Sequence, residues 1–279
     1  MEERTYHCLV AGLPEIAFGD ITLPISPLDL KGILRQELHD KDYSQLEMLL
    51  YPYDHENLVR FLQGLEGVEE GLANFSSGDF RDQQELFTAI VPGDDVLPAY
   101  MAEVMLHYLN APKEIDHVRC RKDLDHAYYK HIELVGNRFV REYTQFEYDI
   151  SNLLCFLKAA RFDTEPVACV TGENPFARHL RQMKGKSITK YPEFEYFDEI
   201  LSIEKTTVYS LAELDYDRLR WSVIEEITLF EDFTGDAVLG YFAKLLIADR
   251  WSRMNESAGK ERLLEAVEHA LKDKIPELF

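Results

Sequence analysis

The sequence predicts an almost wholly α-helical protein, and three observations carry that prediction. Apolar side chains recur every three or four residues through much of the chain, which is the period of one helix face. Proline and glycine stand between these periodic segments, where helices end. The hydrophobic fraction of 46% is ordinary for a folded chain of 279 residues. A chain of this length buries a core without needing disulfides or metals.

The N-terminal segment is the one candidate for extended structure. Residues 6–14 are apolar and contain Gly12 and Pro14, so we expect one strand or a buried extended piece there. Ser26 and Pro27 then match an N-cap followed by proline at the first helical position. A helix is therefore expected from Pro27. The residues expected on its apolar face are Leu30, Ile33, Leu34 and Leu38.

Proline and N-cap residues divide the next part of the chain into short helices. One helix is expected from Tyr43 to Tyr51, ending at Pro52, because proline lacks the N–H that a helix interior needs. Another is expected to start at Asp54, a good N-cap, and to stop near Gly64. After a glycine-rich connector, further helices are predicted over residues 81–90 and 94–109.

The longest periodic segment runs from Lys113 to Phe162 and contains no proline and one glycine, Gly136. It predicts either one very long helix or two helices joined by a slight break near Gly136. One helix of that length exceeds the diameter of a small globule, so the sequence predicts an elongated multi-helix body. The stripe comprises Ile115, Val118, Leu124, Tyr128, Ile132, Val135, Phe139, Tyr143, Phe146, Ile150, Leu153 and Leu157.

Four helices are expected in the C-terminal part of the chain. Thr234 and Gly235 supply a break between the middle two. The expected helices cover residues 194–203, 215–230, 236–254 and 257–272.

Two segments share a pattern that predicts an internal duplication. Residues 53–62 and 148–157 both read Y-D-x-x-N-L-x-x-F-L. The Asp and the Asn of each copy lie three residues apart and share one helix face. Structural roles are expected for Asp54, Asn57, Asp149 and Asn152. Asp54 is expected to cap its helix, whereas Asp149 lies inside the long stripe and must act differently.

These patterns predict a single helical body over residues 1–279 with repeated helical units. The expected pseudo-repeats cover residues 1–95 and 96–190, followed by a divergent C-terminal unit over residues 191–279.

The charge balance limits the classes of partner. The chain has 30 Lys and Arg against 51 Asp and Glu, a formal net charge of −21. Such a field repels nucleic acid and anionic lipid, and it favours a basic protein partner or simply solubility. The N-terminus does not have the pattern of a signal peptide, and no window approaches the roughly 20 apolar residues of a membrane span. Any membrane association is expected to go through a partner.

One basic cluster interrupts the acidic chain after Pro166. The pattern is typical of a solvated helix end and loop, and its functional alternative is a contact for an acidic partner. The candidate contact residues are Arg178, Arg181, Lys184 and Lys186.

No catalytic motif is present in the sequence. The phosphate loops GxxxxGK[ST] and GxGxxG, the elbow GxSxG and the zinc motif HExxH are all missing. The best metal candidate is Glu114 with His117, expected on one helix. Its nearest counterpart, Asp123 with His126, follows on the same helix and cannot face it across a bundle core. We expect no catalytic residue, no metal and no cofactor.

The four cysteines form neither a CxxC pair nor a zinc-like spacing. They are interpreted as reduced, mostly packed thiols. They are Cys8, Cys120, Cys155 and Cys169.

Residues 146–161 carry F-E-Y-D-I-S-N-L and, further on, Arg161. This segment resembles a repeated motif of one rotary-ATPase subunit, which is named C in archaeal-type enzymes and d in vacuolar ones. The sequence also resembles an uncharacterised bacterial family usually encoded beside V/A-type ATPase genes. The Leu13-Pro14 opening and residues 236–245 and 249–251 agree with that family. The chain is shorter than expected for the C/d-type stalk protein and has no clean third copy of the motif.

The resemblance implies an all-α fold like that of the C/d-type stalk protein of V/A-type ATPases. It implies a non-catalytic central-stalk subunit of the rotor, which couples the membrane ring to the central axle during ATP-linked ion transport. The expected partners are therefore the other ATPase subunits. The expected location is cytoplasmic, peripheral to the membrane through those partners. Two alternatives stay open: a soluble helical adapter or scaffold unrelated to the ATPase, and a metal-dependent helical enzyme that uses Glu114 and His117.

Overall fold

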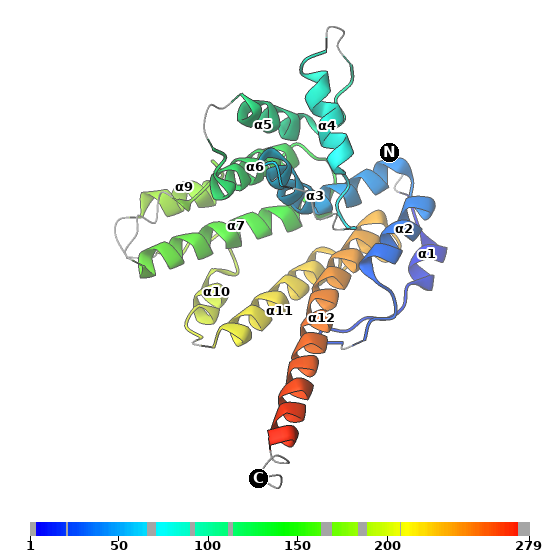
Figure 1. Ribbon diagram of the computed structural model, residues 1–279, viewed down its shortest axis with the longest axis vertical. Helices are drawn as coiled ribbons and strands as arrows, with labels where there is room; N and C mark the ends of the chain where they lie inside the picture. Colours follow the sequence, from blue (N-terminus) through cyan, green and yellow to red (C-terminus); the bar gives the residue numbers. More distant parts are fainter. Residues whose placement is uncertain are drawn as a thin grey trace. The chain divides into compact units, whose positions relative to one another are not determined.

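The computed structural model is all-helical in the residues that it describes (Figure 1). The one β interaction in that part is an isolated bridge between Thr5 and Thr234. None of the described helices combines the length and the apolar character needed to cross a bilayer. The described residues are 4–20, 22–65, 71–89, 93–110, 114–162, 169–183, 189–206 and 208–272, with the backbone alone described at 209 and 255–272.

The chain forms two compact units. Unit 1 combines residues 1–37 with residues 217–279, and unit 2 comprises residues 38–216. Helix α11 (Tyr209–Ile227) contributes residues to both. In this division the two ends of the chain join in a unit of their own. The expected single body over residues 1–279 stays a prediction. The repeat boundaries expected at 95/96 and 190/191 stay predictions.

Unit 1 begins with helix α1 (His7–Gly12), where we expected an extended piece. Extended pairing is limited to Thr5 and to Tyr6, whose N–H donates to the Phe233 carbonyl at 2.6 Å. A strand needs a neighbour to satisfy its backbone groups, and the described residues offer His7–Gly12 none. The segment instead closes a short helix, and none of its side chains is buried.

Helix α2 (Pro27–Glu37) confirms the predicted start. The Ser26 hydroxyl accepts a hydrogen bond from the Asp29 N–H at 3.1 Å, as an N-cap does. Leu30 and Leu34 are fully buried, whereas Ile33 is 43% exposed and lies off the apolar face. Helix α2 packs against α12 (Gly235–Lys272).

Helix α12 continues through residues 255 and 256, where we expected a break between two helices. The prediction is wrong because Asn255 and Ser257 lower helix propensity by less than about 1 kcal/mol each and do not remove a backbone donor. The break before α12 is confirmed: α11 ends at Ile227, and the Thr234 hydroxyl accepts from the Ala237 N–H at 3.4 Å.

Unit 2 contains the other described helices and most of the buried apolar side chains of the described residues. The helices at 81–90, 94–109 and 194–203 are confirmed with shifted ends as α4, α5 and α10. The helices of unit 2 are α3 (Asp40–Leu62), α4 (Ser77–Leu86), α5 (Ala99–Leu109), α6 (His117–Ile132), α7 (Arg138–Arg161), α9 (Pro175–Gln182) and α10 (Phe197–Ile203).

Helix α3 runs through Pro52, where the sequence predicted an end. Proline removes one backbone donor, so the Met48 carbonyl four residues earlier loses its helical partner. The Tyr128 hydroxyl from α6 donates to that carbonyl at 3.0 Å. A tertiary contact thus replaces the missing bond, and Asp54 lies inside α3 rather than at its N-cap.

The long stripe folds back on itself as α6 and α7. Asn137 accepts from the Val140 N–H at 2.7 Å and starts a new helix after α6 has ended at Ile132. The rings of Tyr129 and Tyr148 stack with centroids 3.9 Å apart, and Tyr128 reaches Thr144. The two helices are therefore antiparallel neighbours. The prediction of a single long helix is therefore wrong. The expectation of an elongated body was derived from that helix, so this segment no longer supports it.

The Tyr128–Met48 contact yields a stability test. We expect Tyr128→Phe to lower the free energy of unfolding by about 1–3 kcal/mol, because it leaves the partly buried Met48 carbonyl without this partner. Pro52→Ala restores a backbone donor to the same carbonyl. In that background Tyr128→Phe should cost less than half as much in urea denaturation. Equal costs in both backgrounds would contradict the compensation.

Candidate functional site

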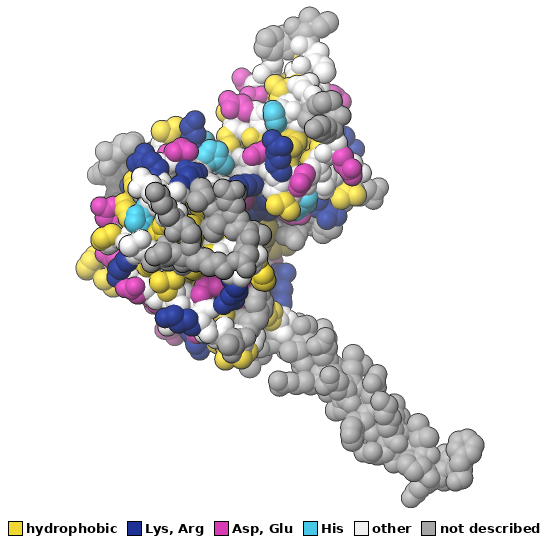
Figure 2. Space-filling model, turned by 90° about the vertical axis from the view of Figure 1, so that its left-hand side faces the viewer, with side chains coloured by type: hydrophobic (Ala, Val, Ile, Leu, Met, Phe, Trp, Pro, Cys, Tyr) yellow, Lys and Arg dark blue, Asp and Glu magenta, His cyan; other side chains and the backbone are white. Residues whose placement is uncertain are grey.

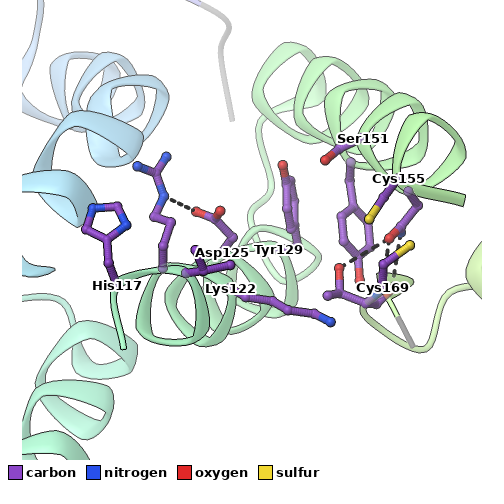
Figure 3. A pocket seen from close by; sticks show the side chains of 12 residues that line it. His117, Lys122, Asp125, Tyr129, Ser151, Cys155 and Cys169 are labelled. Atoms are coloured by element: carbon purple, nitrogen blue, oxygen red, sulfur yellow. Dashed lines mark hydrogen bonds and ion pairs between the residues drawn. The ribbon is translucent and has the colours of Figure 1, made fainter. Parts of the chain in front are cut away.

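A pocket of about 310 Å³ opens in unit 2 between α6, α7 and the segment that follows Cys169 (Figure 3). Helix α6 supplies its charged side chains, including Arg121, Lys122 and Asp125. Helix α7 contributes Tyr148 and Cys155. The antiparallel pairing of α6 and α7 brings these side chains together, although they are up to 34 residues apart in the chain.

One end of the pocket contains a chain of polar contacts. The Arg121 guanidinium bonds Asp125 at 3.0 Å and Glu56 at 3.3 Å, and His117 contacts the same Glu56 at 3.0 Å. The exposed or half-exposed positions of Glu56 and His117 make these weak ion pairs. Their effect is to fix the α6 side chains that line the pocket.

A buried network extends from Asp125 into the core. His55 is fully buried on α3, with Nδ1 2.9 Å from Asp125 and Nε2 2.9 Å from the Tyr100 hydroxyl. Burial lowers the pKa of His55. Burial opposes ionisation of Asp125, yet the His55 hydrogen bond and the Arg121 charge hold its pKa below the ordinary value.

The geometry assigns a neutral His55 that donates to the Asp125 carboxylate and accepts from Tyr100. Burial raises the pKa of Tyr100 well above its ordinary value. Its hydroxyl therefore stays protonated, and the network ties α3, α5 and α6 together rather than moving a proton. No sequence motif points to these three residues, which meet only in the fold.

The other end of the pocket brings two thiols together. Cys155 on α7 and Cys169 share a side-chain hydrogen bond, and both sulfurs lie at the same end of the pocket (Figure 3). The bond from Cys169 lowers the pKa of Cys155 to about 7 against the opposing effect of burial, and the charges of Lys122 and Lys158 assist. The same bond, with burial, raises the pKa of Cys169. Their spacing in the sequence predicted packed thiols and gave no sign of this pairing.

Asn152 holds the segment that carries Cys169 against α7. The residue is 2% exposed, and its carboxamide accepts from the Thr171 N–H at 2.9 Å and donates to the Thr171 carbonyl at 3.1 Å. Gly172 follows with a φ of +78°, and a Cβ there would lie 1.3 Å from the Tyr148 hydroxyl. Only glycine allows this close approach and this backbone conformation.

Asp149 lies one turn before Asn152 on α7 and binds a residue further along the same segment, Asn174. Its carboxylate accepts from the Asn174 amide at 2.8 Å and from the Gln145 amide at 3.0 Å. Asn174 in turn caps α9, accepting from the Ala177 N–H at 2.7 Å. Burial raises the pKa of Asp149 to about 6, and the two hydrogen bonds oppose that shift.

The first copy of the motif repeats this arrangement. Asp54, fully buried inside α3, accepts from the Asn74 amide at 2.8 Å and from the backbone N–H groups of Asn74 and Phe75. Asn57 is also buried. We call α3, residues 71–76 and α4 the first helix–loop unit, and α7, residues 169–174 and α9 the second. In both units a buried Asp inside the long helix bonds an Asn in the loop before the next helix.

The candidate contact residues of the basic cluster have separate surroundings. Arg178 is exposed on α9. Arg181 donates to the Val170 carbonyl at 3.2 Å and pairs with Glu173, so it also holds the second loop. Lys184 and Lys186 lie outside the described residues. Figure 2 shows one face on which acidic, basic and apolar side chains are intermixed.

The metal candidates Glu114 and His117 do not lie on one helix. Asp116 accepts from the Arg119 N–H at 3.1 Å and starts α6 at His117, so Glu114 precedes the helix. His117 contacts Glu56 instead. Among the described residues, no group of three or more His, Cys, Asp or Glu side chains is placed to hold a metal.

Residues 3–275 match the family described as protein of unknown function (DUF2764). No curated protein matches the chain. No solved structure matches it either.

Asn152 is the first residue to test. We expect Asn152→Ala to lower the free energy of unfolding by about 1–3 kcal/mol, because the partly buried Thr171 N–H and carbonyl lose their partner. Urea denaturation measures this, with the exposed Asn110→Ala as a control for generic loss of an amide. An unchanged transition midpoint for Asn152→Ala would contradict the assigned contact.

Asp149 predicts a pH-dependent contribution to stability. Its folded pKa of about 6 lies above the unfolded value of 3.8. The group therefore stabilises the fold when protonated, and this contribution is lost as the pH rises through about 6. Asp149→Asn stays neutral, so it should gain about 1 kcal/mol relative to the wild type between about pH 5.5 and about pH 8.

Urea denaturation at both pH values gives the difference in free energy of unfolding between Asp149→Asn and the wild type. The contributions of the other titrating groups cancel in this difference. Asp94→Asn removes an exposed carboxylate and controls for the change in net charge. A difference between Asp149→Asn and the wild type that does not change with pH would show that the burial of Asp149 has no energetic effect.

Proposed function

We propose that this chain, which belongs to the DUF2764 family of unknown function, is a non-catalytic central-stalk subunit of a V/A-type rotary ATPase. In this role it couples the membrane ring to the central axle during ATP-linked ion transport. Its partners are the other ATPase subunits. It lies at the cytoplasmic face and is attached to the membrane through them.

The observation that carries the proposal is the repeated helix–loop unit. The segment that resembles the C/d-type stalk protein contains Asp149 and Asn152, and its first copy contains Asp54 and Asn57. Asp149 bonds Asn174 at 2.8 Å, and Asp54 bonds Asn74 at the same distance. Two short sequences that resemble each other by chance have no reason to make the same long-range contact. The shared contact supports a duplicated unit, which the resemblance implies.

The chemistry of the two units favours a mechanical role. Asp54 in the first unit and Asn152 in the second bind backbone groups of a loop and tie them to a long helix. Breaking such a contact leaves several buried polar groups unpaired, so the loops resist displacement. A protein that passes torque between two partners needs this resistance. The net charge of −21 keeps such a body soluble.

The proposal is tested by purification of a tagged chain from native membranes in mild detergent. We expect the catalytic subunits and the ring subunit of the ATPase to be recovered in fixed ratio to the tagged chain. If Arg178 contacts a partner, Arg178→Glu should reduce this recovery. Arg119→Glu, the same charge change at an exposed site on α6, should not.

Recovery of the tagged chain without ATPase subunits, in detergent and after chemical cross-linking in cells, would contradict the proposal. A reproducible set of other proteins in that experiment would instead favour the helical adapter.

A further inference from the structure

The end of the pocket with Cys155 and Cys169 combines three features that a pair of merely packed thiols does not need. The two side chains are hydrogen-bonded to each other, both are partly accessible to solvent, and both line the same pocket (Figure 3). Cys120, by contrast, is fully buried on α6. A small oxidant that enters the pocket can therefore reach both sulfurs.

The second helix–loop unit positions the pair. Cys155 follows Asn152 by three residues and lies on the same face of α7. Cys169 precedes Thr171 by two residues, and Asn152 holds Thr171 on both its N–H and its carbonyl. One buried amide, that of Asn152, thus connects α7 to the segment that contains Cys169. The folded structure therefore keeps the two sulfurs near each other.

The surroundings of the pair distinguish the two thiols. Donation from Cys169 and the positive charges of Lys122 and Lys158 hold the pKa of Cys155 near 7, although burial opposes this. Cys169, as the donor, keeps its proton. At neutral pH about half of the Cys155 side chains are therefore thiolates, whereas Cys169 stays a thiol. This is the arrangement of an attacking and a resolving cysteine.

We propose that Cys155 and Cys169 are a peroxide-sensitive pair that closes to a reversible disulfide between α7 and the loop before α9. Cys155 is the attacking sulfur and Cys169 the resolving one. The inference stands apart from the ATPase role, because it rests on the pocket alone.

The oxidant is hydrogen peroxide. The Cys155 thiolate attacks one peroxide oxygen, an S–O bond forms and the O–O bond breaks. The leaving hydroxide combines with the proton that Cys155 released to solvent on ionising, and this gives the first water. The product is a sulfenic acid at Cys155. The Cys169 sulfur then attacks the Cys155 sulfur, the S–S bond forms, and the S–O bond breaks. The departing hydroxide takes the Cys169 proton as water. Two thiols and one peroxide become one disulfide and two waters, and a dithiol reverses the step.

The first test uses the full-length chain and stoichiometric hydrogen peroxide. Non-reducing peptide mapping by mass spectrometry should find one peptide that joins Cys155 to Cys169, and dithiothreitol should remove it. Cys8→Ser and Cys120→Ser should leave the joined peptide intact. Joined peptides in which other cysteines pair equally often, or no joined peptide, would overturn the proposal.

The second test separates the roles of the two thiols. With Cys169→Ser, dimedone should trap a sulfenic acid at Cys155, because the resolving sulfur is missing. With Cys155→Ser, trapping at Cys169 should be at least tenfold weaker. Equal trapping at both positions would overturn the assignment. The disulfide itself is mapped in the wild-type chain, so that result does not depend on whether a variant folds.

A third measurement addresses the reactivity of the wild-type Cys155. A thiol of pKa about 7 is about half ionised at neutral pH, against about 1% for one of pKa 9, while its lower basicity reduces its nucleophilicity several-fold. Iodoacetamide should therefore label Cys155 about fivefold faster in the folded chain than in the chain unfolded in guanidinium chloride. Slower labelling in the folded chain would show a merely packed thiol.

Discussion

The hydrogen bond between a buried Asp inside a long helix and an Asn in the following loop is the contact on which most of unit 2 depends. Asp149 binds Asn174, which caps α9, and Asp54 binds Asn74, which lies two residues before the cap of α4. Asp149 thus holds the cap of α9, and Asp54 holds the loop just before the Ser76 cap of α4. A buried carboxylate is costly to desolvate, and these donors offset that cost. Without them both loops would lose a contact that positions them, and the Asn174 cap of α9 would lose its partner.

The pocket follows from the same contacts. Helices α6 and α7 meet along the face of Tyr129 and Tyr148, and Asn152 brings the second loop to the edge of that interface. The loop then closes one side of the pocket and presents Cys169 to Cys155. On the other side of the pocket, the buried His55 contacts Asp125 from the core. The pocket is therefore bounded by residues whose positions are set by buried polar contacts rather than by apolar packing alone.

The proposed stalk role and the proposed thiol pair are compatible within one chain. The helix–loop units resist displacement because several buried groups must be unpaired at once. A disulfide between Cys155 and Cys169 adds a covalent tie at the same connection. Oxidation would therefore stiffen a unit that is already held by hydrogen bonds, and it would leave the first helix–loop unit, which has no cysteine in its described residues, unchanged.

Local signals in the sequence predict where several helices begin. Ser26 and Pro27 start α2 as expected, and Thr234 starts α12. Such signals fail where a distant residue compensates a local defect. Pro52 is tolerated inside α3 because Tyr128 supplies the donor that its own backbone lacks. The stripe from Lys113 to Phe162 is helical over most of its length, as its period predicts, yet periodicity alone does not tell one long helix from two that fold back on each other.

By itself, the sequence determined the helical class, the acidic charge and the duplicated Asp-x-x-Asn pattern, because these depend on residue type and on spacing of three or four. Only the tertiary structure decided what the pattern does. The partners of Asp54 and Asp149 lie 20 and 25 residues away, and Cys155 meets Cys169 only through the loop that Asn152 holds. Contacts of that separation are set by how helices pack and loops return, and no local rule of sequence encodes them.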